Sequence, residues 1–292
     1  MNLERFGMDT TTLAGPLEAK LRAVKAAGFT QIMLNSSDIV GHPEGEEAAL
    51  AAVRASGLRA TGFQVLRDFE GLSGHLHAYK VDVAKAMLQM CNALGSNILL
   101  ACSSTSAHAS GERELLARDL QKLATLAVPL NIRIAFEALS WGRYVSEFTQ
   151  AWELVQEADR ANLGVCLDSY HIIATRTELD GLQELDPHKV FLVQLSDFLW
   201  QELRSPEDRI DTARHYRVFP GEGVHSTELG ELVRQIDEMG YRGDYSFEVF
   251  NDDYRNLPLP MVCERAKRSV KWVSDLVSRR SLPPRRTGTL RT

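Results

Sequence analysis

Short apolar runs alternate with helix-like segments along almost the whole of this 292-residue chain. Eight of the runs have the length and apolar content of buried parallel strands. In chain order they span residues 5–8, 31–34, 60–65, 97–101, 133–137, 163–168, 190–194 and 245–248. The segments between them carry helix signals, such as Pro16 near a first turn and Gly28 after a last turn. Strands that alternate with helices predict a parallel sheet with crossover connections.

Eight strand–helix units in about 280 residues favour a single α/β domain with the (β/α)8 TIM-barrel fold, whose usual length is ~250 residues. The alternative is a doubly wound open sheet, which more often has a glycine-rich phosphate loop after its first strand. No such loop follows residues 5–8. We therefore expect the barrel to occupy residues 1–278. Residues 279–292 hold five arginines, two prolines and no acid, which predicts a disordered basic tail or, alternatively, a basic contact segment.

The net charge of −6 argues against a general nucleic-acid binder, which normally has a basic face. No apolar run approaches the ~18 residues of a membrane span, and residues 1–13 lack the apolar core of a signal peptide. The four cysteines show no CxxC spacing. These features predict a reduced cytoplasmic protein without disulfides and without a nucleic-acid or membrane partner. They leave open whether the chain forms a homo-oligomer.

The last four predicted strands each end in a side chain that offers an oxygen ligand. These side chains are Glu137, Asp168, Gln194 and Glu248. In a closed parallel barrel the C-terminal ends of the strands meet at one mouth, where three carboxylates repel each other unless a cation lies among them. A ligand set of oxygens suits Mg²⁺ or Mn²⁺, with Co²⁺ as a further candidate, better than a thiolate-type zinc site. We therefore predict a divalent-metal site, although each acid alone could simply cap the next helix.

A histidine follows one of these strand ends, and an arginine follows the end of an earlier predicted strand. His171 comes three residues after Asp168, where a neutral imidazole could take a proton from a metal-bound substrate. The alternative is a structural or solvated histidine. Arg67 follows the third predicted strand and offers a planar fork that matches a carboxylate. Its spacing allows an ion pair with Asp68, Glu70 or another loop acid equally well.

A loop with glycines and a proline follows the seventh predicted strand and contains Arg217, which could reach substrate oxygens or be solvated. Trp141 and Arg143, just past Glu137, could wall a pocket or pack on the surface. A metal ion beside a base favours enolate chemistry, because the metal polarises a carbonyl while the base removes a C–H proton. The intermediate then reprotonates, as in an isomerase or epimerase, or expels a hydroxyl, as in a dehydratase.

Five motifs spread over most of the predicted barrel resemble the 3-dehydroshikimate dehydratases. This group lies within the xylose-isomerase-like barrel superfamily of sugar isomerases, epimerases and endonucleases. The motifs are RDFEG at 67–71, FEALSWGR at 136–143, GVCLDSYH at 164–171, VQLSD at 193–197 and FEVFND at 247–252. Gln194 discriminates best, because the sugar epimerases usually carry histidine at this position.

By this resemblance, the four oxygen side chains would bind a divalent ion and His171 would be the general base. Arg67 would hold the carboxylate of a small-molecule substrate, and Arg217 would contact its ring oxygens. The implied reaction removes water from 3-dehydroshikimate to give protocatechuate, in quinate and shikimate catabolism or in biosynthesis. The sequence departs from the group at Asn35 and Leu66, near the expected pocket rim.

Two rival functions use related barrels. A divalent-metal-dependent ketose isomerase or epimerase would use the same metal and enolate chemistry on an uncharged sugar. An endonuclease-type barrel fits less well, because such sites usually bind several zinc ions through many histidines. The 8 histidines of this chain do not gather at the predicted strand ends.

Overall fold

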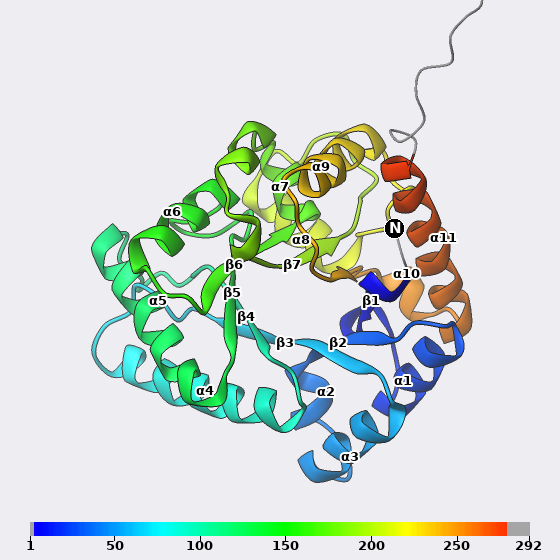
Figure 1. The fold of residues 1–292 in the computed structure, drawn as a ribbon, viewed down its shortest axis with the longest axis horizontal. Coiled ribbons are helices and arrows are strands. Elements are labelled where there is room, and N and C mark those ends of the chain that lie inside the picture. The colour runs from blue at the N-terminus through cyan, green and yellow to red at the C-terminus, as the bar shows by residue number, and fades with distance from the viewer. Residues whose placement is uncertain (1–2, 279–292) are drawn as a thin grey trace, which may run out of the picture.

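The computed structural model describes residues 3–278, and its eight parallel strands close into one barrel in sequence order (Figure 1). The (β/α)8 prediction is therefore confirmed. The predicted tail at 279–292 lies outside the described residues. The strands are β1 (Phe6–Asp9), β2 (Gln31–Asn35), β3 (Arg59–Arg67), β4 (Ile98–Cys102), β5 (Arg133–Glu137), β6 (Leu163–Asp168), β7 (Val190–Leu195) and β8 (Tyr245–Phe247). The ring closes where β1 pairs in parallel with β8.

Helices surround the barrel (Figure 1). They are α1 (Leu17–Ala26), α2 (Ser36–Val40), α3 (Glu46–Ser56), α4 (Gly74–Ala93), α5 (Arg113–Ala127), α6 (Phe148–Ala158), α7 (Ser169–Thr175), α8 (Pro206–His215), α9 (Ser226–Glu238), α10 (Asp252–Arg255) and α11 (Leu259–Ser278). Short 3-10 helices span Leu3–Arg5, Thr10–Thr12, Val128–Leu130, Leu179–Glu184 and Pro187–Lys189. None of the helices within residues 3–278 is long and apolar enough to cross a bilayer.

The helices hold to the barrel through one apolar face. In α5, Leu116, Leu120, Leu123 and Ala127 recur at helical spacing, and all four are buried. α3 ends at Gly57, whose φ of 65° is the left-handed conformation that glycine adopts without a steric cost. Long helices therefore lie in the segments between strands, where such signals predicted them.

Four helices, α2, α7, α8 and α10, are absent from the sequence-based prediction. α7 begins directly after β6 and is only seven residues long, too short to show a helical repeat. α8 interrupts the segment between β7 and α9. Its start is marked by a capping box in which Ser205 and Asp208 bond each other's backbone N–H groups. Only two of its residues are buried, so it lacks the apolar face that reveals longer helices.

The strands place their residues in two separate apolar layers. Phe136 and Leu167 lie in the layer between the barrel and the helices, whereas Ala135, Cys166 and Leu192 belong to a second cluster inside the barrel. Successive side chains of a strand point to opposite sides. The residues two positions further along β5, β6 and β7 therefore also point inward, at the C-terminal mouth.

Candidate active site

Because side chains alternate along a strand, three of the predicted ligands point inward at the barrel mouth. Glu137, Asp168 and Gln194 each lie two residues beyond an inward-pointing apolar residue on three adjacent strands, β5 to β7. The register pairs Asp168 directly with Gln194. Glu248 comes directly after β8. All four side chains are buried. The structure thus brings together the four oxygens that the sequence analysis selected.

Contacts among these side chains show how close they lie. Ligand atoms of Glu137, Asp168 and His171 are all within 4.8 Å of one another. Nη1 of Arg217 lies 2.7 Å from Oδ2 of Asp168 and 3.1 Å from Oε2 of Glu248. Asp168 also accepts the backbone N–H of Tyr170 at 2.8 Å and so caps α7. Oδ1 of Asp168 thus caps the next helix, as the alternative for a single acid predicted, while Oδ2 contacts Arg217 in the cluster.

Three further residues, which the sequence analysis did not select, form hydrogen bonds with the predicted ligands. The Cys102 thiol donates to Oε2 of Glu137 at 2.9 Å, and the Cys166 thiol donates to Oε1 of Gln194 at 3.2 Å. Gln64 connects Gln194 to Glu248 through its amide. The sequence held a signal for two of them. Gln64 is the second-last residue of the third apolar run, and Cys102 directly follows the fourth run.

The electrostatics of the cluster fit a divalent cation. Burial, together with Asp168 and Glu248, raises the pKa of Glu137 well above its ordinary value. Burial and Asp168 likewise raise the pKa of Glu248. Oε1 of Glu137 is buried without a hydrogen-bond partner. When all three carboxylates are ionised, they and the Arg217 guanidinium carry two net negative charges, which one divalent ion would neutralise.

Arg217 is a buried part of this cluster rather than a solvated loop residue. Its burial alone would lower the pKa of the guanidinium, but Asp168 and Glu248 outweigh this and raise the pKa above its ordinary value. The guanidinium also lies over the ring of Tyr170, 4.4 Å from the ring centroid. Arg217 also lines a cavity at the barrel mouth, which is described below. Its contact with substrate oxygens stays a prediction.

Asp9, at the end of β1, adds a carboxyl that the sequence analysis missed because the predicted first strand stopped one residue short of it. The side chain is fully buried, and its Oδ2 has no hydrogen-bond partner. Burial and then Glu248 raise the pKa of Asp9 well above its ordinary value. Burial therefore makes the charged form of Asp9 less favourable than it is for a solvated aspartate.

His171 is held in place by its neighbours on both sides. The Ser140 backbone N–H and hydroxyl both lie 3.1 Å from Nδ1, and Nε2 lies 3.6 Å from Oδ2 of Asp168. The ring also meets the Trp141 ring edge-on, with 5.1 Å between centroids. Burial, assisted by Arg217 and opposed by Asp168, lowers the pKa of His171 to about 3. The ring is therefore neutral at physiological pH.

The tautomer of His171 decides which ring nitrogen can accept a proton. A backbone N–H can only donate, so the Ser140 N–H favours the ring with its proton on Nε2. Nε2 can take a proton only in the other tautomer, which carries its hydrogen on Nδ1. Oγ of Ser140 is the acceptor that this second tautomer needs.

A cavity of about 290 Å³ opens above the cluster. Its walls include Glu137, His171 and Glu248 together with Trp141 and Arg67. Trp141 therefore walls the pocket as one alternative proposed, whereas Arg143 is exposed and bonds Tyr144 instead.

Two exposed arginines, Arg67 and Arg214, line this cavity. Within residues 3–278 no carboxylate forms an ion pair with either of them. Asp68 accepts the backbone N–H of Thr105 at 2.8 Å, and Glu70 accepts the backbone N–H of Ser104. Neither neighbouring acid is therefore paired with Arg67. Arg214, which lies in the last turn of the unpredicted α8, was missed.

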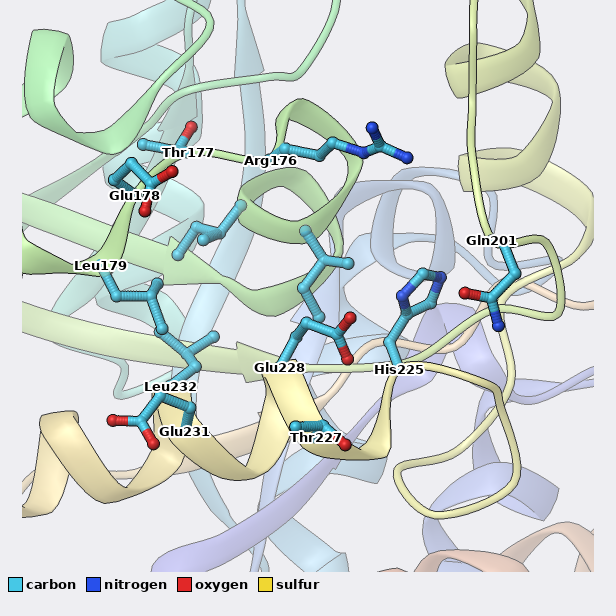
Figure 2. Close-up of a pocket in the computed structure, with 12 residues that line it drawn as sticks. Arg176, Thr177, Glu178, Leu179, Gln201, His225, Thr227, Glu228, Glu231 and Leu232 are labelled. Carbon is cyan, nitrogen blue, oxygen red and sulfur yellow. The ribbon is translucent and has the colours of Figure 1, made fainter.

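A second hollow, of about 510 Å³, is lined by residues of α7 and of the start of α9. Figure 2 shows Arg176 at the end of α7, with His225 and Glu228 facing it from the start of α9. None of the four predicted ligands lines this hollow. The chemistry predicted from the sequence therefore belongs to the smaller cavity.

Glu70 gives the mouth a pH-dependent stability. Only 2% of this residue is exposed, and burial raises its pKa from 4.5 to about 8. Between these two pH values the folded protein binds more protons than the unfolded chain, so the free energy of unfolding falls as pH rises. We expect Glu70→Gln to change the free energy of unfolding more favourably at pH 8 than at pH 5. The difference between the two effects should be about 2–4 kcal/mol.

Urea denaturation at both pH values measures this difference. The exposed Glu184→Gln is the matched control and should show no such gain. An equal effect of Glu70→Gln at pH 5 and pH 8 would show that the carboxyl does not titrate in this range.

The comparisons with known proteins agree with this geometry. A family model described as xylose isomerase-like TIM barrel matches residues 21–276. The chain belongs to this family. A solved structure of a xylose isomerase-like TIM barrel/4-hydroxyphenylpyruvate dioxygenase fusion protein superposes with a TM-score of 0.88 at 31% identity, covering 96% of this chain and 45% of that one. The crystal structure of an IOLI protein with a bound zinc atom has a TM-score of 0.79 at 22% identity, covering 94% of this chain and 98% of the other.

Curated relatives are named for two activities. A 3-dehydroshikimate dehydratase of Pseudomonas aeruginosa is 38% identical over 91% of this chain and 41% of its own length. The chain thus spans less than half of this relative. A 3-dehydroshikimate dehydratase of Neurospora crassa is 26% identical, and the match covers 89% of both chains. An inosose isomerase of Bacillus subtilis is 26% identical over 78% of this chain and 77% of its own length.

Proposed function

We propose that this chain is a metal-dependent dehydratase that converts 3-dehydroshikimate to protocatechuate and water. One observation carries the proposal: a neutral, buried His171 lies within 4.8 Å of two carboxylates in a cavity that the unpaired Arg67 also lines. The Pseudomonas and Neurospora relatives named for this activity support it. The match to the Neurospora relative, which is named 3-dehydroshikimate dehydratase, covers 89% of each sequence.

Four residues would hold the metal ion: Glu137, Asp168, Gln194 and Glu248. Their oxygen atoms favour Mg²⁺ or Mn²⁺, while the zinc atom in the IOLI structure makes zinc the competitor to test. A divalent ion bound there would supply positive charge beside the substrate ketone, where negative charge develops during the reaction. The orphaned Oε1 of Glu137 supports this assignment.

His171 would carry the proton transfer. The enone of 3-dehydroshikimate makes its remote ring CH₂ acidic. Nε2 would take one proton from this carbon when the ring carries its hydrogen on Nδ1, for which Ser140 Oγ is the acceptor. The electron pair delocalises toward the ketone oxygen. The hydroxyl on the neighbouring carbon then leaves with a proton as water, and one further ring proton shifts to the ketone oxygen. The product is the aromatic catechol, whose aromaticity drives the elimination.

Arg67 would bind the substrate carboxylate, with Arg214 as a second cation at the cavity. We expect Arg67→Met to lower kcat/KM for 3-dehydroshikimate by about 10- to 100-fold, mainly through KM, because an interaction remote from the reacting carbons stabilises ground state and transition state alike. Steady-state kinetics measures the split. Arg143→Met, an exposed arginine outside the cavity, is the matched control. A fall in kcat at unchanged KM would contradict the assigned role.

The decisive experiment is an activity assay with metal-replete protein. Chelator-stripped protein is reloaded with Mg²⁺ or Mn²⁺, incubated with 3-dehydroshikimate and followed at the ultraviolet band of protocatechuate. Growth of this band that depends on the metal is the expected result, and its absence would overturn the proposal. Turnover of uncharged ketoses that is insensitive to Arg67→Met would instead support the isomerase or epimerase alternative, which the inosose isomerase relative keeps under test.

The setting we propose is the cytoplasm, within quinate and shikimate catabolism. All four cysteines are free and buried, which fits a reducing compartment. The proposed partner is a small-molecule carboxylate rather than nucleic acid or a membrane. Growth on quinate by a strain that lacks the gene, compared with the wild type, tests this assignment.

A further inference from the structure

Among the four proposed ligands, Gln194 differs in that its two terminal atoms are unlike. A carboxylate presents an oxygen to a cation whichever way it is rotated. An amide presents an oxygen in one orientation and an NH₂ group, which cannot bind a cation, in the other. A site that uses Gln194 as a ligand therefore needs neighbours that set the orientation of the amide.

A chain of buried hydrogen bonds supplies such neighbours. Nε2 of Gln64 donates to Oε1 of Glu248 at 3.2 Å, and Oε1 of Gln64 accepts from Nε2 of Gln194 at 3.4 Å. On the other side of the amide, the Cys166 thiol donates to Oε1 of Gln194 at 3.2 Å. Gln64, Gln194 and Cys166 are each at most 2% exposed, so water does not compete for these contacts.

The direction of each bond follows from Glu248. With a cation bound, the Glu248 carboxylate would be ionised and could only accept, so Gln64 would turn its NH₂ group toward Glu248 and its carbonyl oxygen toward Gln194, as the two bonds in the structure run. That oxygen requires a donor, which is the NH₂ group of Gln194. The carbonyl oxygen of Gln194 is then directed away from Gln64 and toward Cys166. The thiol uses one lone pair of this oxygen and leaves the other for a cation.

We propose that Gln64 and Cys166 are positioning residues that orient the Gln194 amide so that its oxygen faces the divalent ion. The inference rests on the metal site of the proposed function and deepens it, because it identifies the residues that support one ligand. Partners of this kind, which orient metal ligands, typically change metal affinity by about 10- to 100-fold when they are removed.

The test measures binding of Mn²⁺ alone to chelator-stripped protein, by calorimetry or by the electron paramagnetic resonance signal of free Mn²⁺. Gln64→Met keeps the side-chain length but removes both hydrogen bonds, and we expect it to weaken Mn²⁺ binding by about 10- to 100-fold. Gln31→Met is the matched control. Gln31 is a buried glutamine at the start of β2, at the opposite end of the barrel, where it accepts from Arg59. This control should leave Mn²⁺ affinity unchanged.

Cys166 provides a second, independent pair of variants. Cys166→Ser retains a donor and should bind Mn²⁺ within about 3-fold of the wild type, whereas Cys166→Ala should bind it about 10-fold more weakly. Equal affinities of the serine and alanine variants would overturn the role of the thiol. This pair also keeps the inference testable if Gln64→Met fails to fold.

A double-mutant cycle separates orientation from general structural damage. In a Gln194→Glu background both terminal oxygens are equivalent, so no orientation remains to be set. Gln64→Met should then lose most of its effect on Mn²⁺ affinity. An equal loss in both backgrounds would overturn the inference while leaving the metal site intact. Failure of the wild type to bind Mn²⁺ or any other divalent ion would overturn the metal part of the proposed function and this inference together.

Discussion

Glu137→Gln should weaken Mn²⁺ binding by more than about 100-fold, and turnover of 3-dehydroshikimate should fall with it at fixed metal concentration. The substitution preserves the shape of the side chain but removes one of three carboxylate charges and the orphaned oxygen Oε1. Loss of a direct ligand should exceed the ~10- to 100-fold cost of losing a residue that only orients one. The amide can still bond the Cys102 thiol, so the surrounding packing should survive.

Titration of chelator-stripped protein with Mn²⁺ measures this affinity. Glu70→Gln is the matched control, since Glu70 is also a buried carboxyl near the mouth but does not line the cavity. The control should bind Mn²⁺ as the wild type does. Wild-type affinity in Glu137→Gln would remove Glu137 from the ligand set, and excess metal should restore turnover in the variant if its only defect is weaker binding.

His171→Ala should lower kcat by about 10³-fold while Mn²⁺ affinity stays within a few-fold of the wild type. General acid–base catalysis typically contributes 10²- to 10⁴-fold, and no other neutral histidine lines the cavity within the described residues. The low pKa of His171, about 3, keeps the ring unprotonated, so its loss should leave the charge of the cluster unchanged at neutral pH.

Single-turnover kinetics at saturating substrate and metal measures the chemical step. His225→Gln, a buried histidine that bonds the Trp200 carbonyl in the second hollow, is the control and should retain turnover. Wild-type kcat in His171→Ala would reject His171 as the base. A large loss of Mn²⁺ affinity would instead make the imidazole a metal ligand, as its closeness to Glu137 and Asp168 permits.

Local sequence patterns predicted the fold and the positions of the four oxygen side chains for a common physical reason. Burial of parallel strands on both faces requires continuous apolar runs, and a polar residue that ends such a run must lie at a strand end. Glu137 and Asp168 end β5 and β6 at the residues predicted. The alternation of inward and outward side chains then directs both toward the barrel axis, so a closed barrel makes their convergence unavoidable.

The partners of those ligands could not be predicted in the same way. Arg217 and Asp168 are 49 residues apart, and Gln64 and Gln194 are 130 residues apart. The local sequence does not distinguish an arginine that forms ion pairs with two buried carboxylates from an exposed arginine without an ion pair. Arg67 and Arg217 have similar loop settings in the sequence, yet the first is exposed and unpaired within residues 3–278 and the second is buried among acids.

By itself, the sequence determined the (β/α)8 barrel, the four oxygen side chains at its mouth and the histidine beside them, because each depends on strand length, parity or a short spacing. Only the tertiary structure decided which arginines at the cavity have no ion pair within the described residues and which neighbours bond the four oxygen side chains. Those choices depend on contacts between distant strands, whose geometry is set when the barrel closes and brings the ends of β3, β6, β7 and β8 to one mouth.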